Sequence, residues 1–106
     1  MLTHDHTVFT YEPDGQARGL LIGSEIGEYG VVVEYLVVFP EAPPQTLPNM
    51  IRAGYAEAKA YGYRQAIVHV PEADPRGGAL ARLLTRHGFA MYADTSDGTW
   101  WNRWIA

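Results

Sequence analysis

The run Val31–Phe39, VVVEYLVVF, constrains the fold more than any other segment of the sequence. Its residues are almost all β-branched or aromatic, and Glu34 is its one charged residue. Such a run is typical of a central strand that is buried on both faces of its sheet. A chain with this strand needs cover on both sides of the sheet, and this requirement predicts an α/β domain.

Hydrophobic spacing and turn residues predict seven further elements around this strand. The crossover from residues 31–39 to residues 65–70 should be parallel and right-handed, and the hairpins at both ends of the chain should be antiparallel. We expect the first helix on one face of the sheet and the second on the other. The order is β-β-β-α-β-α-β-β, a mixed, mostly antiparallel sheet with two helices. The remaining expected strands are 7–11, 17–26, 89–94 and 99–105. The expected helices run from the N-cap Thr46 to Gly62 and from the end of the loop 72–78 to Gly88.

Length and charge limit the classes of function. The chain of 106 residues is expected to form one domain, residues 1–106, with a single core. A net charge of −4 and the lack of a Lys/Arg run argue against nucleic-acid binding. There is no cysteine, which removes thiolate nucleophiles and Cys-type zinc sites. The sequence shows neither a signal peptide nor a long apolar segment, so a soluble, cytoplasmic protein without a membrane partner is expected.

The turn after the central strand lacks the features of an anion-binding loop. In β-α-β units that bind phosphate, this turn offers glycines and free backbone N–H groups. Here it is the segment 40–48, in which four of the nine residues are proline and Glu41 adds a negative charge. Proline has no N–H group to donate. The β-α-β order is that of a cofactor-binding enzyme, whereas the composition of this loop is not that of a phosphate-binding loop.

Together with this order of elements, the segment 83–89, LLTRHGF, resembles the GNAT superfamily of acyl-CoA-dependent N-acetyltransferases. Members commonly carry a stretch such as L-Y-E-K-x-G-F at the end of the last helix. They also end the central strand in V-x-P, which matches VFP at residues 38–40. The resemblance covers roughly residues 7–105 and implies a GNAT-like fold.

The chain departs from this family at its main functional positions. The family's pyrophosphate loop, approximately R-G-x-G-hydrophobic-G, aligns with residues 43–48, PPQTLP, where Leu47 is the one match. The tyrosine that serves the family as general acid aligns with Leu84, which has no proton to give. The asparagine that often contacts the cofactor arm aligns near Gly77. The family's first strand and its two leading helices, which cover the sheet, have no counterpart.

Two parts of the family's site remain as candidates. Some members activate the attacking amine with a glutamate on the central strand, and this resemblance makes Glu34 the catalytic candidate. The alternative is a structural carboxylate that faces a cross-strand partner. If acyl-CoA binds, the resemblance implies contacts from Val38, Phe39 and Leu47.

Histidines and one glycine-rich turn are weaker candidates. The segment 4–6, His-Asp-His, puts two histidines on one strand face without a third ligand at a clear spacing, so we expect a frayed terminus and no metal site. His69 lies in an apolar strand and His87 on the apolar stripe of a helix, positions typical of core or boundary histidines. The segment 76–78, Arg-Gly-Gly, precedes a helix and is either an anion site or, as we expect, a plain turn.

The last strand, residues 99–105, carries aromatic side chains on both of its faces. Trp100 and Trp104 share one face, and Trp101 shares the other with Ile105. Either the chain covers both faces itself, or one face meets a partner. Large aromatic residues are enriched at the centres of interfaces, so the three tryptophans are the interaction candidates.

Two functional hypotheses follow. The first is a non-catalytic, GNAT-like pseudoenzyme that needs no cofactor and acts through a protein partner or self-association, as a subunit or accessory component. Trimmed members of the family also occur among tailed-phage proteins, so the resemblance is compatible with a location within a virion. The second is an acyl-CoA-dependent N-acyltransferase that holds acetyl-CoA with an atypical loop.

Overall fold

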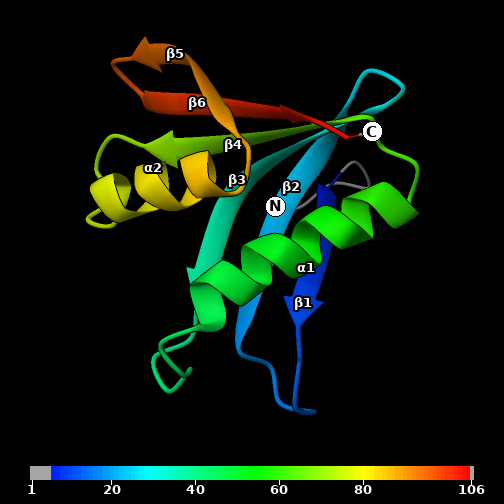
Figure 1. Ribbon diagram of the computed structural model, residues 1–106, viewed down its shortest axis with the longest axis vertical. Coiled ribbons are helices and arrows are strands. Elements are labelled where there is room, and N and C mark those ends of the chain that lie inside the picture. Colours follow the sequence, from blue (N-terminus) through cyan, green and yellow to red (C-terminus); the bar gives the residue numbers. More distant parts are fainter. Residues whose placement is uncertain (1–5, 106) are drawn as a thin grey trace.

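A computed structural model describes residues 6–105 (Figure 1). It confirms the predicted order of strands and helices, with boundaries close to those expected. His4 and Asp5 of the candidate metal motif lie outside the described residues. No helix in residues 6–105 is both long and apolar enough to cross a membrane. The elements are β1 (His6–Tyr11), β2 (Gly19–Ile26), β3 (Gly30–Val38), α1 (Thr46–Ala60), β4 (Gln65–Pro71), α2 (Gly77–Arg86), β5 (Ala90–Thr95) and β6 (Gly98–Trp104).

All strands join one six-stranded sheet in the order β1-β2-β3-β4-β6-β5. β3 and β4 pair in parallel, and the other neighbouring pairs are antiparallel, as the sequence predicts. The last hairpin inserts β6 between β4 and β5. Because β6 is antiparallel to both of these strands, β5 runs parallel to β4.

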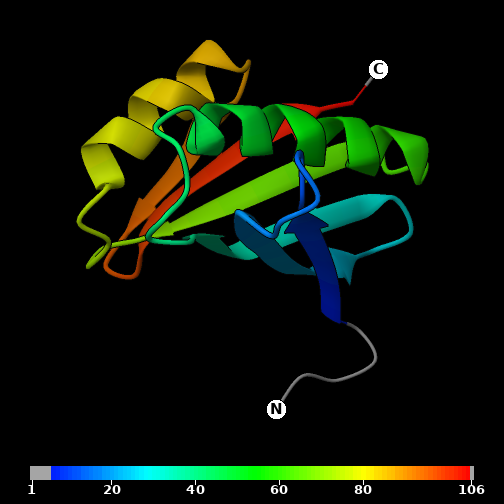
Figure 2. The same ribbon diagram turned by 90° about the horizontal axis from the view of Figure 1, so that it is seen from below.

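Both helices pack on the same face of the sheet (Figure 2). Ile51 of α1 and Leu84 of α2 belong to one core cluster, together with Val68 of β4 and Trp101 of β6. The expectation that α2 would lie on the opposite face is therefore wrong. The crossovers β3-α1-β4 and β4-α2-β5 step across the sheet in the same direction, and right-handed crossovers in one direction place their helices on one face.

The opposite face carries no helix within residues 6–105, and we call it the open face (Figure 2). On β3, Val31 faces the helices and is buried, whereas Tyr35 on the open face is 60% exposed and Val37 is 37% exposed. The prediction that this strand is buried on both faces is thus correct only for its first half. The large apolar residues that the strand register places on the open face are Val8, Leu20, Ile22, Ile26, Val32, Tyr35, Val37, Ile67, Trp100 and Trp104.

An irregularity in β3 divides the sheet. Ile22 of β2 pairs with Tyr35, but the next residue, Gly23, pairs with Val33, so Glu34 is an extra residue in a β-bulge. The parallel ladder between β3 and β4 ends at the same level, with the pair Val33 and Val68. Beyond the bulge the two strands run apart, and β3 and β4 point in different directions (Figure 1).

We expect Gly23→Ala to destabilise the fold and disturb the bulge. A Cβ atom at Gly23 would lie 2.1 Å from the carbonyl oxygen of Val32, closer than backbone atoms can approach. The substitution should lower the free energy of unfolding by about 1–3 kcal/mol or more, which urea denaturation would measure. Gly77→Ala is the matched control, because a Cβ atom there meets nothing within 4 Å. Equal stability of the two variants would contradict this description of the bulge.

Candidate functional site

The place where β3 and β4 separate is the candidate site. Open α/β sheets bind ligands beyond the carboxyl ends of their parallel strands, where neighbouring strands lead to separate connections. Here β3 leads into α1 and β4 leads into α2, and both helices begin beside the gap between the strands (Figure 1). The bulge at Glu34 creates this gap, because it ends the ladder between the two strands.

An apolar cavity of about 130 Å³ lies between α1 and the sheet, and its wall reaches the end of the β3–β4 ladder at Val33, Leu36 and Val68. The sheet supplies Val33, Leu36 and Val68 to its wall, and α1 supplies Ile51 and Tyr55. The remaining lining residues on β3, β4 and α2 and in the loop after α2 are Val31, Ala66, Leu84 and Phe89. The larger part of the lining comes from β1, β2, the second half of α1 and the loop after it. The cavity therefore offers an apolar ligand a partly enclosed space.

Leu84, which aligns with the family's tyrosine acid, lines this cavity and has no exposed surface. The structure thus places position 84 in the wall of the cavity. Its aliphatic side chain packs within the core cluster. This residue contributes shape to the cavity and no proton.

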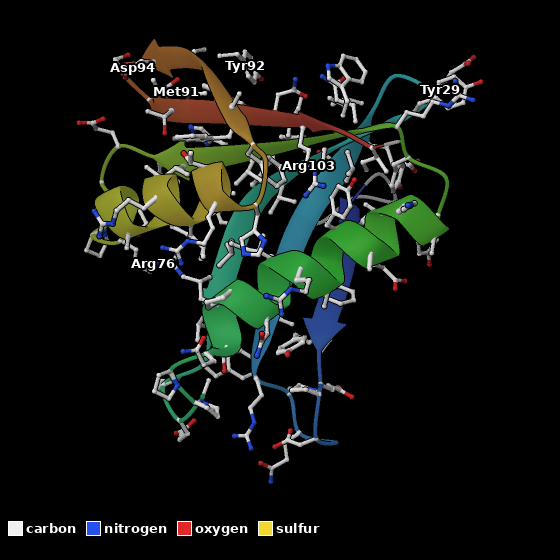
Figure 3. The ribbon with its side chains drawn as sticks, in the orientation of Figure 1. Tyr29, Arg76, Met91, Tyr92, Asp94 and Arg103 are labelled. Carbon is white, nitrogen blue, oxygen red and sulfur yellow. The ribbon has the colours of Figure 1, made fainter. Side chains whose placement is uncertain are left out.

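Arg76 lies at the gap and bonds to β3 across it. Its Nη2 donates to the carbonyl oxygen of Leu36 at 2.8 Å, beyond the end of the β3–β4 ladder. Asp74 holds the guanidinium with both carboxylate oxygens, at 3.1 Å to Nε and 2.9 Å to Nη2. Asp74 also accepts the backbone N–H of Arg76 at 2.8 Å. Figure 3 shows the Arg76 side chain reaching from the start of α2 toward the gap.

The sequence points to one member of the Arg76–Asp74 pair. The segment 76–78 is a candidate anion site for which a plain turn is the expectation. The sequence reasoning misses Asp74, although an aspartate two residues before an arginine at a helix start is a pattern from which such a turn can be recognised. The turn forms, with Gly77 N–H donating to the Asp74 carbonyl at 3.0 Å, and it also positions a cation.

The proline-rich loop uses some of its own N–H groups internally. Ala42 N–H donates to the Phe39 carbonyl, and Thr46 N–H donates to the Pro43 carbonyl, both at 3.0 Å. Gln45, rather than the expected Thr46, is the N-cap of α1, and it makes no side-chain cap hydrogen bond. The loop therefore forms two turns that use two of its five N–H groups, and its four prolines have none to offer.

The residues predicted to contact the cofactor lie in different elements near the gap and do not form one continuous surface. Val38 ends β3, and Phe39 follows it with its N–H donating to Arg18. Leu47 packs against the core from the first turn of α1. Glu34, the one carboxylate of β3, is half-buried at the bulge. It follows Val33, the last residue of β3 that pairs with β4.

The histidines lie at boundaries. His69 stacks on Trp100 with ring centroids 4.1 Å apart on the open face. His87, after α2, lies among cations: burial lowers the pKa of its imidazole, and Arg52, Arg103 and Arg86 lower it further. A histidine with a lowered pKa is neutral at pH 7, which fits a boundary residue.

The three tryptophans have different surroundings. Trp101 is buried in the chain's own core, and its Nε1 donates to the Thr99 hydroxyl at 2.9 Å. Trp100 is half-buried against His69. Trp104 is 68% exposed on the open face. Of the three interaction candidates, Trp101 has no free surface to offer, and Trp104 has the most.

The structure closely resembles solved N-acetyltransferases. The PaiA N-acetyltransferase of Thermoplasma acidophilum in complex with coenzyme A has a TM-score of 0.72 and 13% identity, over 95% of this chain and 62% of that chain. An IAA acetyltransferase from Bacillus cereus has a TM-score of 0.76 and 12% identity, over 95% of this chain and 79% of that chain. The Campylobacter jejuni N-acetyltransferase PseH in complex with acetyl coenzyme A has a TM-score of 0.72 and 13% identity, over 98% of this chain and 71% of that chain.

These likenesses establish the fold. The chain has the GNAT fold. It spans less than two thirds of the Thermoplasma protein and up to 79% of the others. No family model matches the sequence, and no curated protein matches it either.

We expect Asp74→Asn to lower stability at neutral pH and to matter less in acid. The hydrogen bonds from the Arg76 side chain hold the pKa of the Asp74 carboxyl below its usual 3.8, against the opposing effect of burial. A lowered folded-state pKa stabilises the protein above the unfolded pKa, and the gain is lost as pH falls through the folded value. Urea denaturation at pH 7 should show a loss of about 1–2 kcal/mol, moderated because Arg76 is partly exposed.

The same measurement near pH 2 should show a smaller difference between Asp74→Asn and wild type. Asp94→Asn, at an exposed position on β5, is the control, and we expect it to change stability by no more than about 0.5 kcal/mol. If Asp74→Asn lowers the free energy of unfolding as much near pH 2 as at pH 7, the ion pair with Arg76 is not the source of the loss.

Proposed function

We propose that this chain is an N-acyltransferase that binds an acyl-CoA in the gap between β3 and β4. The observation that carries the proposal is the gap itself: a bulge ends the parallel ladder, both helices begin there, and an apolar cavity under α1 reaches it at Val33 and Leu36. Structural neighbours that bind coenzyme A or acetyl coenzyme A support it. The proposal takes the second of the two hypotheses raised by the sequence.

The residues at the gap fit one part of an acyl-CoA better than the other. The apolar cavity suits the acyl group and the adjoining carbon chain, and the Leu36 carbonyl is an acceptor for an amide N–H. The proline loop suits the pyrophosphate poorly, because four of its nine residues have no N–H group and two of the other five N–H groups bond within the loop. Arg76 is the cation that would replace them, since a guanidinium binds phosphate oxygens well.

In the transfer, the amine nitrogen attacks the thioester carbonyl, the C–N bond forms and the C–S bond breaks. Glu34, at the bulge, is the group that would accept the proton from the attacking amine. The departing thiolate takes its proton from solvent, because Leu84 has none to give. General acid catalysis typically contributes about 10²–10⁴-fold, so this enzyme should be slow by that factor.

A non-catalytic role is the second candidate, and two observations favour it. Position 84 has an aliphatic side chain in the core, and the loop before α1 lacks a phosphate cradle. In that case the fold serves a protein partner, and acetyl-CoA does not bind. One binding measurement separates the two candidates.

We expect acetyl-CoA to raise the melting temperature of the wild-type protein. A ligand at 100 times its dissociation constant adds about 2.7 kcal/mol of stability, which for a domain of this size corresponds to roughly 10 °C. S-acetyl-N-acetylcysteamine, an acetyl thioester without phosphates, should bind more weakly. Arg76→Gln should weaken binding of acetyl-CoA about tenfold and leave binding of the short thioester nearly unchanged, as calorimetry would show.

No melting shift with millimolar acetyl-CoA would overturn the acyltransferase proposal and favour the non-catalytic candidate. Equal effects of Arg76→Gln on both thioesters would show instead that Arg76 shapes the gap and does not meet the phosphates.

We expect Glu34→Gln to lower kcat for amine acetylation about 100-fold with little change in KM for acetyl-CoA. The amide keeps the size of the side chain but is no base. Thiol release, followed by a colorimetric thiol reagent, would measure the rate. Glu28→Gln, at an exposed position in the turn between β2 and β3, is the control and should retain full activity. Unchanged kcat in Glu34→Gln would remove this residue from the reaction.

A further inference from the structure

The apolar cavity under α1 is longer than an acetyl group needs. Its wall meets the gap at Val33 and Leu36. From there it crosses β3 beneath α1 and continues over β2 to β1, where Phe9 lines it. β1 lies two strand spacings, about 10 Å, from β3. The methyl carbon of an acetyl group lies only about 1.5 Å from its carbonyl carbon, so an acetyl group at the gap would leave most of the cavity empty.

The volume of the cavity indicates the size of the group that it holds. A dry apolar cavity of about 150 Å³ binds benzene, a ring of six carbon atoms. This cavity measures about 130 Å³. By that proportion it has room for roughly five carbon atoms beyond a thioester carbonyl, whereas an acetyl group supplies one.

The lining of the cavity favours an apolar occupant. Leu21, Val33 and Ile51 are typical of the side chains between the gap and β1. The polar residues Glu57 and Tyr61 also line it, but both are exposed and lie toward solvent. Among the residues that the structure describes, no buried side-chain nitrogen or oxygen lacks a hydrogen-bond partner. The cavity therefore presents no buried polar group that a ligand would have to satisfy.

Small residues keep the cavity open. Gly54 and Ala58 of α1 and Ala66 of β4 line it. Gly54 lies in the interior of α1, where glycine is less favourable than alanine. A Cβ atom at Gly54 would lie 2.5 Å from Cδ1 of Leu21, so even one added carbon would displace that side chain. Larger residues at these positions would fill the space.

The wall that α1 contributes is held in place by β6. The guanidinium of Arg103 lies over the ring of Tyr55, with its central carbon 3.8 Å from the ring centroid. Arg103 also donates a hydrogen bond to the carbonyl of His87, so its side chain lies between the two helices (Figure 3). Tyr55 lines the cavity and is fixed from outside it. A wall that is ordered in advance reduces the cost of binding.

We propose that the cavity takes the acyl chain of the donor, and that this chain transfers an acyl group of about six carbons in preference to acetyl. The inference rests on the proposed acyltransferase function. Each methylene that leaves water for the cavity should strengthen binding by up to about fourfold. A hexanoyl group has four methylenes more than acetyl, and ordering the chain offsets part of this gain.

Calorimetry of the wild-type protein with acetyl-, butyryl-, hexanoyl- and decanoyl-CoA tests the preferred length. From acetyl- to hexanoyl-CoA the dissociation constant should fall at least about tenfold. From hexanoyl- to decanoyl-CoA it should fall no further, because the cavity is then full. A chain that adsorbs on an open apolar surface would instead bind more tightly with every added methylene.

A variant that fills the cavity tests the location. Ala58→Leu adds three carbon atoms beneath α1 and should reduce the preference for hexanoyl-CoA over acetyl-CoA to about threefold or less. Ala56→Leu is the matched control: it makes the same change at an exposed position of the same helix and should keep the wild-type preference. If Ala58→Leu does not fold, the S-hexanoyl and S-acetyl thioesters of N-acetylcysteamine test the wild-type protein, which should show the same preference without the phosphates.

The outcomes separate this inference from the proposed function. Binding of acetyl-CoA and hexanoyl-CoA with equal affinity would overturn the inference and leave the acyltransferase proposal standing. So would equal effects of Ala58→Leu and Ala56→Leu, or a steady gain in affinity as far as decanoyl-CoA. If neither acetyl-CoA nor hexanoyl-CoA binds, the proposed function is wrong and the inference falls with it.

Discussion

The direction of the two parallel crossovers determines the layout of this protein. Both β3-α1-β4 and β4-α2-β5 step the same way across the sheet, so both helices must lie on one face. This single constraint has two results. It brings the helix N-termini together beside the gap between β3 and β4, which makes the candidate site, and it leaves the opposite face without cover in the described chain.

The direction of the crossovers does not by itself open the gap between β3 and β4. A regular β3 would continue its ladder with β4 and close the space, so the bulge at Glu34 is the local cause of the opening. Gly23 permits the bulge, because its backbone lies where a side chain would meet the Val32 carbonyl. Beyond the bulge the Leu36 carbonyl loses its place in the β3–β4 ladder, and Arg76 satisfies it. A buried carbonyl without a partner is costly, which explains why a cation bridges the gap in the free chain.

Local patterns in the sequence predicted the strands and helices. They did not predict the strand order or the bond from Arg76 to β3, because both depend on residues far apart in the sequence. The helices, the hairpins and the central strand followed from periodicity and turn residues. The parallel relation of β4 and β5 did not, because it depends on β6 inserting between them, and no local pattern encodes strand order. The missed strand order also caused the wrong placement of α2. The resemblance drew attention to position 84, which lines the cavity, whereas the role of Asp74 escaped notice because it holds Arg76 toward the Leu36 carbonyl, which is distant in the sequence.

The bulge gives the two halves of β3 different neighbours. Before the bulge, Val33 faces the cavity and pairs with β4; beyond it, Tyr35 faces away on the open face, and the strand has left β4. This second half keeps its pairing with β2 as far as Val38, which pairs with Gly19. The strand that borders the gap is therefore held from one side while its other side is open to a ligand. A ligand in the gap would meet a wall that is already ordered, so the cost of ordering it on binding would be small.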